Sequence, residues 1–188
     1  MRRKYHGDGG AGVTAGACVP GRDAQNTGAD NCIEDTTTMH TRYLEDFTPG
    51  EVFRTRGMTM DESAIMEFAR QYDPQPIHID KVAADAGPFE GLIASGFHTH
   101  AVIFRLWMDL GLLWESSMGG PGADELRFTA PVRPGDTLRA EVEVLDVIPS
   151  RSKPDRGIIQ YRVTGLNQRD ETVLTVIFVT FVRRRPEG

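Results

Sequence analysis

The chain has 188 residues, 39% of them hydrophobic and 26% charged, which is sufficient for one ordinary domain with an apolar core. The formal net charge is -6 and the basic residues cluster only in two short runs, the basic opening at 2–4 and residues 183–185, so nucleic acid is not expected as a partner, because phosphate binding depends on clustered lysine and arginine. The two cysteines, Cys18 and Cys32, exclude a disulfide-stapled fold. No apolar run has the length of a signal peptide or a membrane helix, so we expect no membrane partner and a cytoplasmic protein.

Residues 1–38 differ in composition from the rest of the chain. They are rich in glycine, alanine, threonine, aspartate and asparagine, and their apolar residues follow no period. Such a segment cannot bury enough surface to offset the entropy lost on ordering. We expect a disordered tail, either a natural extension or the result of a true start at Met39, followed by a single domain over residues 39–188.

The first part of this domain predicts a strand and then a helix. The segment VFRTRGM, residues 52–58, is typical of a strand. Thr59 and Glu62 have the T-x-x-E spacing of a capping box, which predicts a helix start. The apolar positions behind it recur at helical spacing and predict one amphipathic helix: Ala64, Ile65, Phe68, Ala69 and Tyr72.

The segment DPQPIHID, residues 73–80, contains two prolines in three residues and predicts a loop without helix. A short helix is expected over residues 81–86, capped by Asp80 and ended by Gly87.

After Gly96, apolar residues follow the i, i+3, i+4 pattern of one long buried helix that reaches Trp114. The two tryptophans, Trp107 and Trp114, are expected in the core. Three later segments predict long strands: residues 137–147 and 158–164 alternate between apolar and polar side chains, and residues 173–182 are apolar on both faces, as in a central strand covered on both sides. Residues 126–132 supply one more strand. These elements predict an α+β fold in which an antiparallel sheet wraps around the long central helix.

Asp73 and His78 are the residues that point most directly to chemistry. They lie on one proline-stiffened segment, and a carboxylate held near an imidazole can divide proton transfer with it, because imidazole titrates near neutral pH. On composition alone, a structural role for the pair remains open.

Other candidate residues favour structural interpretations. Ser95 lacks the G-x-S-x-G context of a nucleophile and fits a helix N-cap. His98 and His100 are two apart on the predicted helix, so they point about 200° away from each other and cannot both face one metal ion. No phosphate-binding loop or dinucleotide fingerprint is present, and neither a metal nor a cofactor is expected.

The segment around Asp73 resembles the hydratase signature of MaoC-like proteins, roughly G-D-x-N-P-[LIV]-H-x-D. The matching positions are Asp73, Pro76, Ile77, His78 and Asp80. Further similar blocks occur in the same order, at residues 43–53, 91–99 and 131–138, and the resemblance extends from about residue 43 to residue 182. The chain departs from the signature at Gln75, where the family has Asn, and at Tyr72, where it has Gly. The longer Gln75 bears on substrate preference more than on reaction type.

The resemblance implies a hotdog fold, a homodimer or higher oligomer, and a hydratase or dehydratase that adds or removes water across the 2,3 double bond of an enoyl thioester. The substrate would be an acyl-CoA or acyl-carrier thioester, and the hydrated product a (3R)-hydroxyacyl thioester. Asp73 and His78 would be catalytic, the Gly96 backbone N–H would stabilise the thioester oxyanion, and Gln75 and Ser95 would position the substrate.

Two alternatives remain open. A hotdog thioesterase generally depends on a carboxylate in or near the central helix, where this chain offers only Asp109. A non-catalytic acyl-binding subunit of a paired dehydratase is the other, although both catalytic positions are occupied here.

Overall fold

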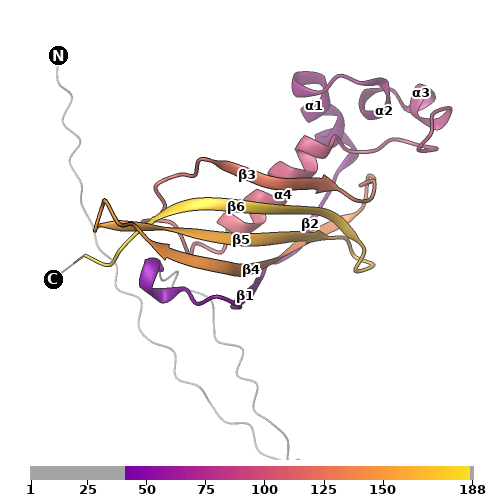
Figure 1. Cartoon of the computed structure of the whole chain (residues 1–188). Helices are drawn as coiled ribbons and strands as arrows, with labels where there is room; N and C mark the ends of the chain where they lie inside the picture. The colour runs from indigo at the N-terminus through magenta and orange to yellow at the C-terminus, as the bar shows by residue number, and fades with distance from the viewer. Residues whose placement is uncertain (1–40, 187–188) are drawn as a thin grey trace, which may run out of the picture. The chain divides into compact units, whose positions relative to one another are not determined.

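An antiparallel sheet forms the body of residues 41–186, the part of the chain that the structure, a computed structural model, describes (Figure 1). The tail expected over residues 1–38 lies outside these residues. The elements are η1 (Leu44–Asp46), β1 (Val52–Arg54), β2 (Met58–Thr59), α1 (Glu62–Tyr72), α2 (Pro76–Ile79), α3 (Lys81–Asp85), α4 (Gly96–Met108), β3 (Gly122–Phe128), β4 (Thr137–Pro149), β5 (Arg156–Leu166) and β6 (Thr172–Arg183). The strands are ordered β1-β4-β5-β6-β3, and β2 pairs with β4.

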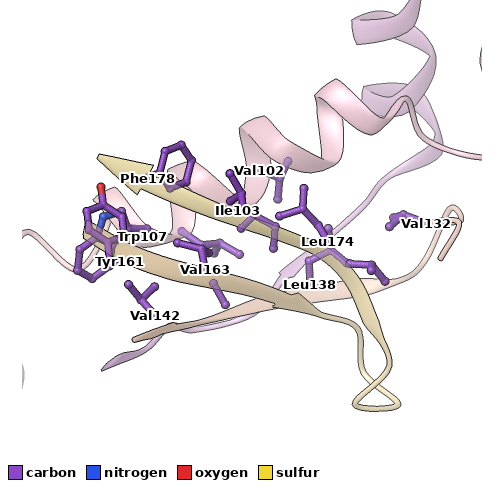
Figure 2. Close-up of a cluster of buried hydrophobic side chains, with 14 of the residues drawn as sticks. Val102, Ile103, Trp107, Val132, Leu138, Val142, Tyr161, Val163, Leu174 and Phe178 are labelled. Atoms are coloured by element: carbon purple, nitrogen blue, oxygen red, sulfur yellow. The ribbon is translucent and has the colours of Figure 1, made fainter. Parts of the chain in front are cut away.

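The core lies between α4 and one face of the sheet (Figure 2). The alternation predicted for β4 and β5 is confirmed, because their inward residues are almost completely buried: Leu138, Ala140, Val142, Val144, Ile159, Tyr161 and Val163. Ile103 and Trp107 of α4 pack against them. Each fully buried aliphatic side chain of this kind stabilises the fold by about 1.5–3 kcal/mol.

Strand β6 is buried on one face only within the described residues. Its inward residues, among them Val176 and Val182, are buried, whereas Ile177, Val179 and Phe181 on the other face are half-buried. The prediction that both faces are covered is therefore wrong for the single chain.

The central helix is shorter than predicted. It begins at Gly96, as expected, but ends at Met108. Gly111 adopts a left-handed conformation, with φ of 70°, which turns the chain away from the helix axis. Trp107 is in the core, but Trp114 lies beyond this turn and is 76% exposed, so its predicted place in the core is wrong.

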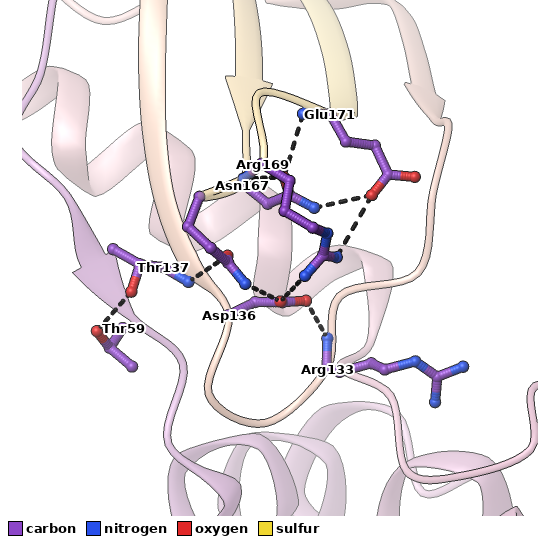
Figure 3. A network of polar contacts seen from close by, with 8 residues as sticks. Thr59, Arg133, Asp136, Thr137, Asn167, Arg169 and Glu171 are labelled. Carbon is purple, nitrogen blue, oxygen red and sulfur yellow. Dashed lines mark hydrogen bonds and ion pairs between the residues drawn. The ribbon is translucent and has the colours of Figure 1, made fainter.

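The predicted strand over residues 52–58 is split into β1 and β2. Between them, the Thr55 hydroxyl accepts a hydrogen bond from Ala140 N at 2.8 Å and so replaces a backbone partner in the ladder. The predicted capping box is also wrong. Helix α1 begins after Asp61, and Thr59 belongs to β2, where its hydroxyl lies 2.9 Å from that of Thr137 (Figure 3).

The segment with two prolines does contain a helix, contrary to the prediction. Pro76 is the first residue of α2, a position where the missing N–H would have no partner in the helix. The expected cap by Asp80 is confirmed, since its carboxylate accepts hydrogen bonds from Val82 N at 3.0 Å and Ala83 N at 3.1 Å at the start of α3.

Strand β3 lies four residues earlier than predicted, and the residues after Phe128 form a loop that leads to β4. A polar network fixes this loop (Figure 3). The buried Asp136 carboxylate accepts hydrogen bonds from Arg133 N at 2.8 Å and from Gln168 Nε2 at 2.7 Å, in the β5–β6 turn. The neighbouring Val132 accepts a hydrogen bond from Ala94 N at 2.8 Å, which ties the loop to the segment that enters α4.

Candidate active site

Asp73 and His78 lie next to each other at the junction of α1 and α2. Asp73 ends α1, with its N–H bonded to Ala69 O at 2.9 Å, and the single turn of α2 turns His78 back toward it. His78 Nε2 lies 3.4 Å from Asp73 Oδ2, and the two side chains are 6% and 17% exposed. The structure thus brings together the carboxylate and the imidazole that the sequence singled out.

The backbone fixes the orientation of the His78 ring. His78 Nδ1 lies 2.8 Å from the carbonyl oxygen of Ile93. A carbonyl oxygen only accepts hydrogen bonds, so Nδ1 carries the proton and donates it. In the neutral ring, Nε2 then presents its lone pair toward Asp73, where a water molecule can donate a hydrogen bond to either group.

Two side chains hold the Asp73 carboxylate. Ser95 Oγ donates a hydrogen bond to Oδ2 at 2.6 Å, and Gln75 Nε2 donates one to Oδ1 at 2.7 Å. These bonds, that of Ser95 first, lower the pKa of Asp73 below its ordinary value, and the nearby His78 adds to the effect, while burial opposes it. The carboxylate is therefore ionised at neutral pH.

Ser95 also begins α4. Its hydroxyl oxygen accepts a hydrogen bond from Phe97 N at 3.2 Å, so the N-cap predicted from the sequence is confirmed. The same hydroxyl therefore links the start of the central helix to Asp73, a contact that the sequence did not predict.

Gly96 borders the cavity that adjoins the dyad. This cavity of about 310 Å³ is lined mainly by apolar side chains, Phe128 and Val132 among them, and His78 and Gly96 also border it. No acceptor within residues 41–186 takes a hydrogen bond from the Gly96 N–H, which lies in the first turn of α4. A Cβ at this position would lie 2.7 Å from the Phe128 ring, so the ring packs directly on the glycine.

His98, His100 and the helix acid Asp109 lie apart from this pair. His98 stacks on Phe68 with ring centroids 4.6 Å apart, and His100 stacks on Phe178 at 5.5 Å. Burial lowers the pKa of both rings and favours their neutral forms. Asp109 caps the C-terminal end of α4, opposite Gly96, and is paired with Arg105.

Within residues 41–186, no three His, Cys, Asp or Glu side chains are grouped as a metal site requires. Across the same residues, none of the helices combines the length and hydrophobicity needed to cross a bilayer.

Sequence reasoning missed two contributors to the site. The Ile93 carbonyl, which orients His78, is a backbone group that exists in every residue and leaves no signal in the sequence. Phe128 lies in a strand both in the prediction and in the structure, where it ends β3, and only its contact with Gly96 shows that it also lines the cavity.

An antiparallel sheet curled around one long helix, with an acid–imidazole pair beside the start of that helix, defines a hotdog-fold enzyme. The family model described as "MaoC like domain" matches residues 46–166, and the chain belongs to this family. Relatives in it are named hydratases and dehydratases, and the chain is accordingly an enzyme of the hydro-lyase type.

Individual relatives cover most of the domain. The uncharacterised protein YdeM of Bacillus subtilis is 36% identical over 141 residues, which are 75% of this chain and 99% of YdeM. The (R)-specific enoyl-CoA hydratase of Rhodospirillum rubrum is 33% identical over 122 residues, which are 62% of this chain and 78% of that protein. The crystal structure of a MaoC-like dehydratase from Rhodospirillum rubrum has a TM-score of 0.73 at 41% identity and covers 78% of this chain and 99% of its own.

Proposed function

We propose that this enzyme adds water to the 2,3 double bond of an enoyl thioester, reversibly, to give a (3R)-hydroxyacyl thioester. The observation that carries the proposal is the 3.4 Å contact between Asp73 Oδ2 and His78 Nε2 at the edge of an apolar cavity. The relatives support the substrate class, since they include an (R)-specific enoyl-CoA hydratase, a 3-hydroxybutyryl-CoA dehydratase and a 3-hydroxyacyl-thioester dehydratase.

The geometry supports separate roles for the dyad and for Gly96 in the reaction. A water bound between Asp73 Oδ2 and His78 Nε2 adds its oxygen to C3 and gives one proton to the pair, which delivers a proton to C2. Negative charge develops on the thioester oxygen during the attack. The Gly96 N–H, at the positive end of the α4 dipole, is the donor we assign to that oxygen.

The dyad is tested by Asp73→Asn and His78→Gln, which keep the shape of each side chain and remove its basicity. Each is expected to lower kcat for hydration of a 2-enoyl-CoA by about 100-fold or more, measured as loss of the conjugated-enoyl absorbance. Asp109→Asn is the matched control and should retain full activity, because Asp109 lies at the other end of α4. Near wild-type rates in both dyad variants would show that other residues catalyse the reaction.

A second assay, the release of free thiol, separates the thioesterase alternative. A thioesterase would release free thiol from a saturated acyl-CoA, whereas a hydratase leaves the thioester intact. The position of Asp109 at the far end of α4 disfavours the thioesterase, since no helix carboxylate borders the cavity in the described residues.

We also propose that two copies of the chain pair through β3. This strand is at the edge of the sheet, and its exposed residues include Asp124 and Glu125 in one half and Arg127 in the other. A two-fold axis pairs such a strand antiparallel with itself, which places opposite charges across from each other. Beside it, Phe97 and Phe104 of α4 are 62% and 40% exposed and would be buried in the pair.

The assembly is tested by light scattering on the purified protein. A dimer mass is expected for the wild type, and Phe104→Glu should shift it toward the monomer because a charge would be buried in the interface. The matched control is Trp114→Glu, at a residue that is also exposed but lies outside α4. A monomeric wild type would contradict the proposal.

A further inference from the structure

Arg133 lies at the rim of the cavity that adjoins the dyad. It follows Val132, which lines the cavity, and its N–H donates a hydrogen bond to the buried Asp136 carboxylate at 2.8 Å. Its side chain is half-buried and extends away from that carboxylate (Figure 3). Nη2 donates a hydrogen bond to the carbonyl oxygen of Phe89, another residue that lines the cavity, at 2.5 Å. The guanidinium is therefore held beside the cavity by the backbone.

The turn at Glu90 and Gly91 is shaped around this guanidinium. Both residues have positive φ, of 51° and 139°. A glutamate in the left-handed region costs free energy, and such a residue persists only where its surroundings fix the backbone. A Cβ on Gly91 would lie 3.0 Å from Arg133 Nη1, so glycine lets the chain pass close to the guanidinium. Within residues 41–186, the N–H groups of Nη1 and Nε have no acceptor.

Arg133 has no counter-ion in the part of the chain that the structure describes. Asp85 Oδ1 lies 3.9 Å from the Cβ position of Gly91, but neither Asp85 nor Glu90 forms an ion pair with the guanidinium among these residues. The lining of the cavity contains no lysine or arginine. An anionic group of a substrate that leaves the cavity at this rim would therefore meet the Arg133 guanidinium.

An enoyl thioester carries such a group on its 4′-phosphopantetheine arm, which coenzyme A and acyl-carrier proteins share. From sulfur to phosphorus, the extended arm is about as long as four residues of extended backbone, roughly 14–16 Å. His78 Nδ1 lies 2.8 Å from Ile93 O. The guanidinium packs on Gly91, two residues before Ile93, a separation of about 7 Å at most. Arg133 is thus within reach of the phosphate when the thioester is at the dyad.

We propose that Arg133 binds the phosphate of the phosphopantetheine arm while the enoyl group lies beside Asp73 and His78. Arginine suits this role because its paired N–H groups bind two phosphate oxygens at once. Arg133 takes no part in the transfer of water or protons, and the dyad and the phosphate site belong to the same chain. This inference rests on the proposed function, since it concerns the same substrate.

The test compares three thioesters of the same enoyl group, on pantetheine, on 4′-phosphopantetheine and on coenzyme A. Pantetheine lacks the phosphate, and coenzyme A adds the nucleotide. Arg133→Gln removes the charge and Arg133→Lys keeps it. Arg56→Gln is the matched control, because Arg56 is an exposed arginine that borders a different cavity together with Asp109, at the other end of α4. Thermal melts establish that the three variants are folded.

At low ionic strength, the wild type should have a KM about tenfold lower for the phosphopantetheine thioester than for the pantetheine thioester, the scale of one charge-assisted contact. Arg133→Gln should raise KM for the phosphopantetheine and CoA thioesters and leave kcat and the pantetheine KM unchanged. Arg133→Lys should keep most of the difference, since lysine also binds phosphate. Arg56→Gln should match the wild type.

A purely structural role for Arg133 would change KM or kcat equally for all three thioesters, and that result would overturn the inference. So would a preference for the phosphopantetheine thioester that survives in Arg133→Gln, or a wild type that gains affinity only from the nucleotide. The same enoyl group on an acyl-carrier protein then identifies the source of the phosphate. KM for the preferred carrier should rise in Arg133→Gln, and an unchanged value would also refute the proposal.

Failure of the proposed function gives a different result. If the wild type hydrates none of the thioesters, calorimetric titration with 4′-phosphopantetheine and with pantetheine tests Arg133 by itself. Binding of 4′-phosphopantetheine alone to the wild type and to Arg56→Gln, lost in Arg133→Gln, supports the phosphate site. No binding to the wild type, or equal binding to all three proteins, refutes it.

Discussion

Replacing Ser95 with alanine removes the hydroxyl oxygen and, with it, two hydrogen bonds. The hydroxyl caps α4 through Phe97 N at 3.2 Å and donates to Asp73 Oδ2 at 2.6 Å. Loss of an N-cap costs about 1 kcal/mol, and loss of a hydrogen bond to a charged group costs about 1.5–3 kcal/mol. We therefore expect Ser95→Ala to lower the free energy of unfolding at pH 7 by about 2.5–4 kcal/mol, more than a cap alone would account for.

The part of this loss that belongs to Asp73 depends on pH. The Ser95 bond lowers the pKa of Asp73 in the folded state, from an ordinary value of 3.8. Stability gained in this way is fully present above pH 3.8 and disappears as the pH falls through the lowered folded-state pKa. The difference between wild type and Ser95→Ala should therefore be complete at pH 7 and shrink in strongly acidic solution toward the contribution of the cap.

Urea unfolding across the acidic range measures this difference, and the pH profile of kcat/KM measures its effect on the dyad. The acidic limb of the profile should move to higher pH in Ser95→Ala, because the Asp73 pKa rises when the donor is lost. Ser95→Thr keeps a hydroxyl and is the control. An acidic limb that stays in place, together with a loss of only about 1 kcal/mol at every pH, would refute the reasoning.

Three further outcomes follow from the site and its surroundings. Gly96→Pro removes the proposed oxyanion donor but places a Cβ against the Phe128 ring, so we combine it with Phe128→Ala. This double variant should fold, and its kcat should be about 100-fold lower than that of Gly96→Ala/Phe128→Ala, which keeps the N–H. Equal kcat values in the two double variants would contradict the assignment of the oxyanion donor. Asp136→Asn replaces a carboxylate oxygen, which accepts hydrogen bonds from Arg133 N and Gln168 Nε2, with an amide NH2 that cannot accept them. The free energy of unfolding in urea should fall by about 1–3 kcal/mol, whereas Arg169→Ser, at the exposed edge of the same network, should change it little. His98→Phe should keep full activity and equal or higher thermal stability, because the His98 Nδ1 atom is buried without a hydrogen-bond partner in residues 41–186; loss of turnover would reveal a chemical role for that ring.

The long strands could be predicted from the sequence because one face of each is buried against α4. Leu138, Ala140, Val142 and Val144 alternate with charged residues, and a period of two has no other simple explanation. Periodicity fails where local geometry ends an element. The apolar spacing continues past Met108 to Trp114, but the left-handed turn at Gly111 redirects the chain, and nothing in the pattern marks the change.

Local motifs predicted the helix boundaries less reliably than the apolar periodicity predicted the strands. Thr59 has the right spacing to Glu62 for a capping box, yet cross-strand pairing with Thr137 takes its hydroxyl. The two prolines at residues 74 and 76 predict a loop, although proline is compatible with the first position of a helix and Pro76 starts α2 there. In both cases the outcome depends on a neighbour distant in sequence or on one position within a turn.

The residues of the candidate site could be predicted from the sequence, but the hydrogen bonds between them could not. The sequence placed Asp73 and His78 on one segment, and the structure brings their side chains within 3.4 Å. The sequence does not show that Ser95 and Gln75 each donate a hydrogen bond to a different oxygen of Asp73. The bond from Ser95 requires the approach of a segment more than twenty residues away.

The hydrogen bond from His78 to the Ile93 carbonyl has a consequence for how this enzyme tolerates mutation. In many sites the group that orients a histidine is an aspartate, and one base change can destroy it. Here the acceptor belongs to the main chain, so replacing the Ile93 side chain leaves it in place. What would move it is a shift of the backbone at residues 92–94, which Ile77 O and Val132 O anchor on either side. The backbone conformation thus determines that Nδ1 of His78 carries the proton. Side chains around it can change while Nε2 remains unprotonated in the neutral ring.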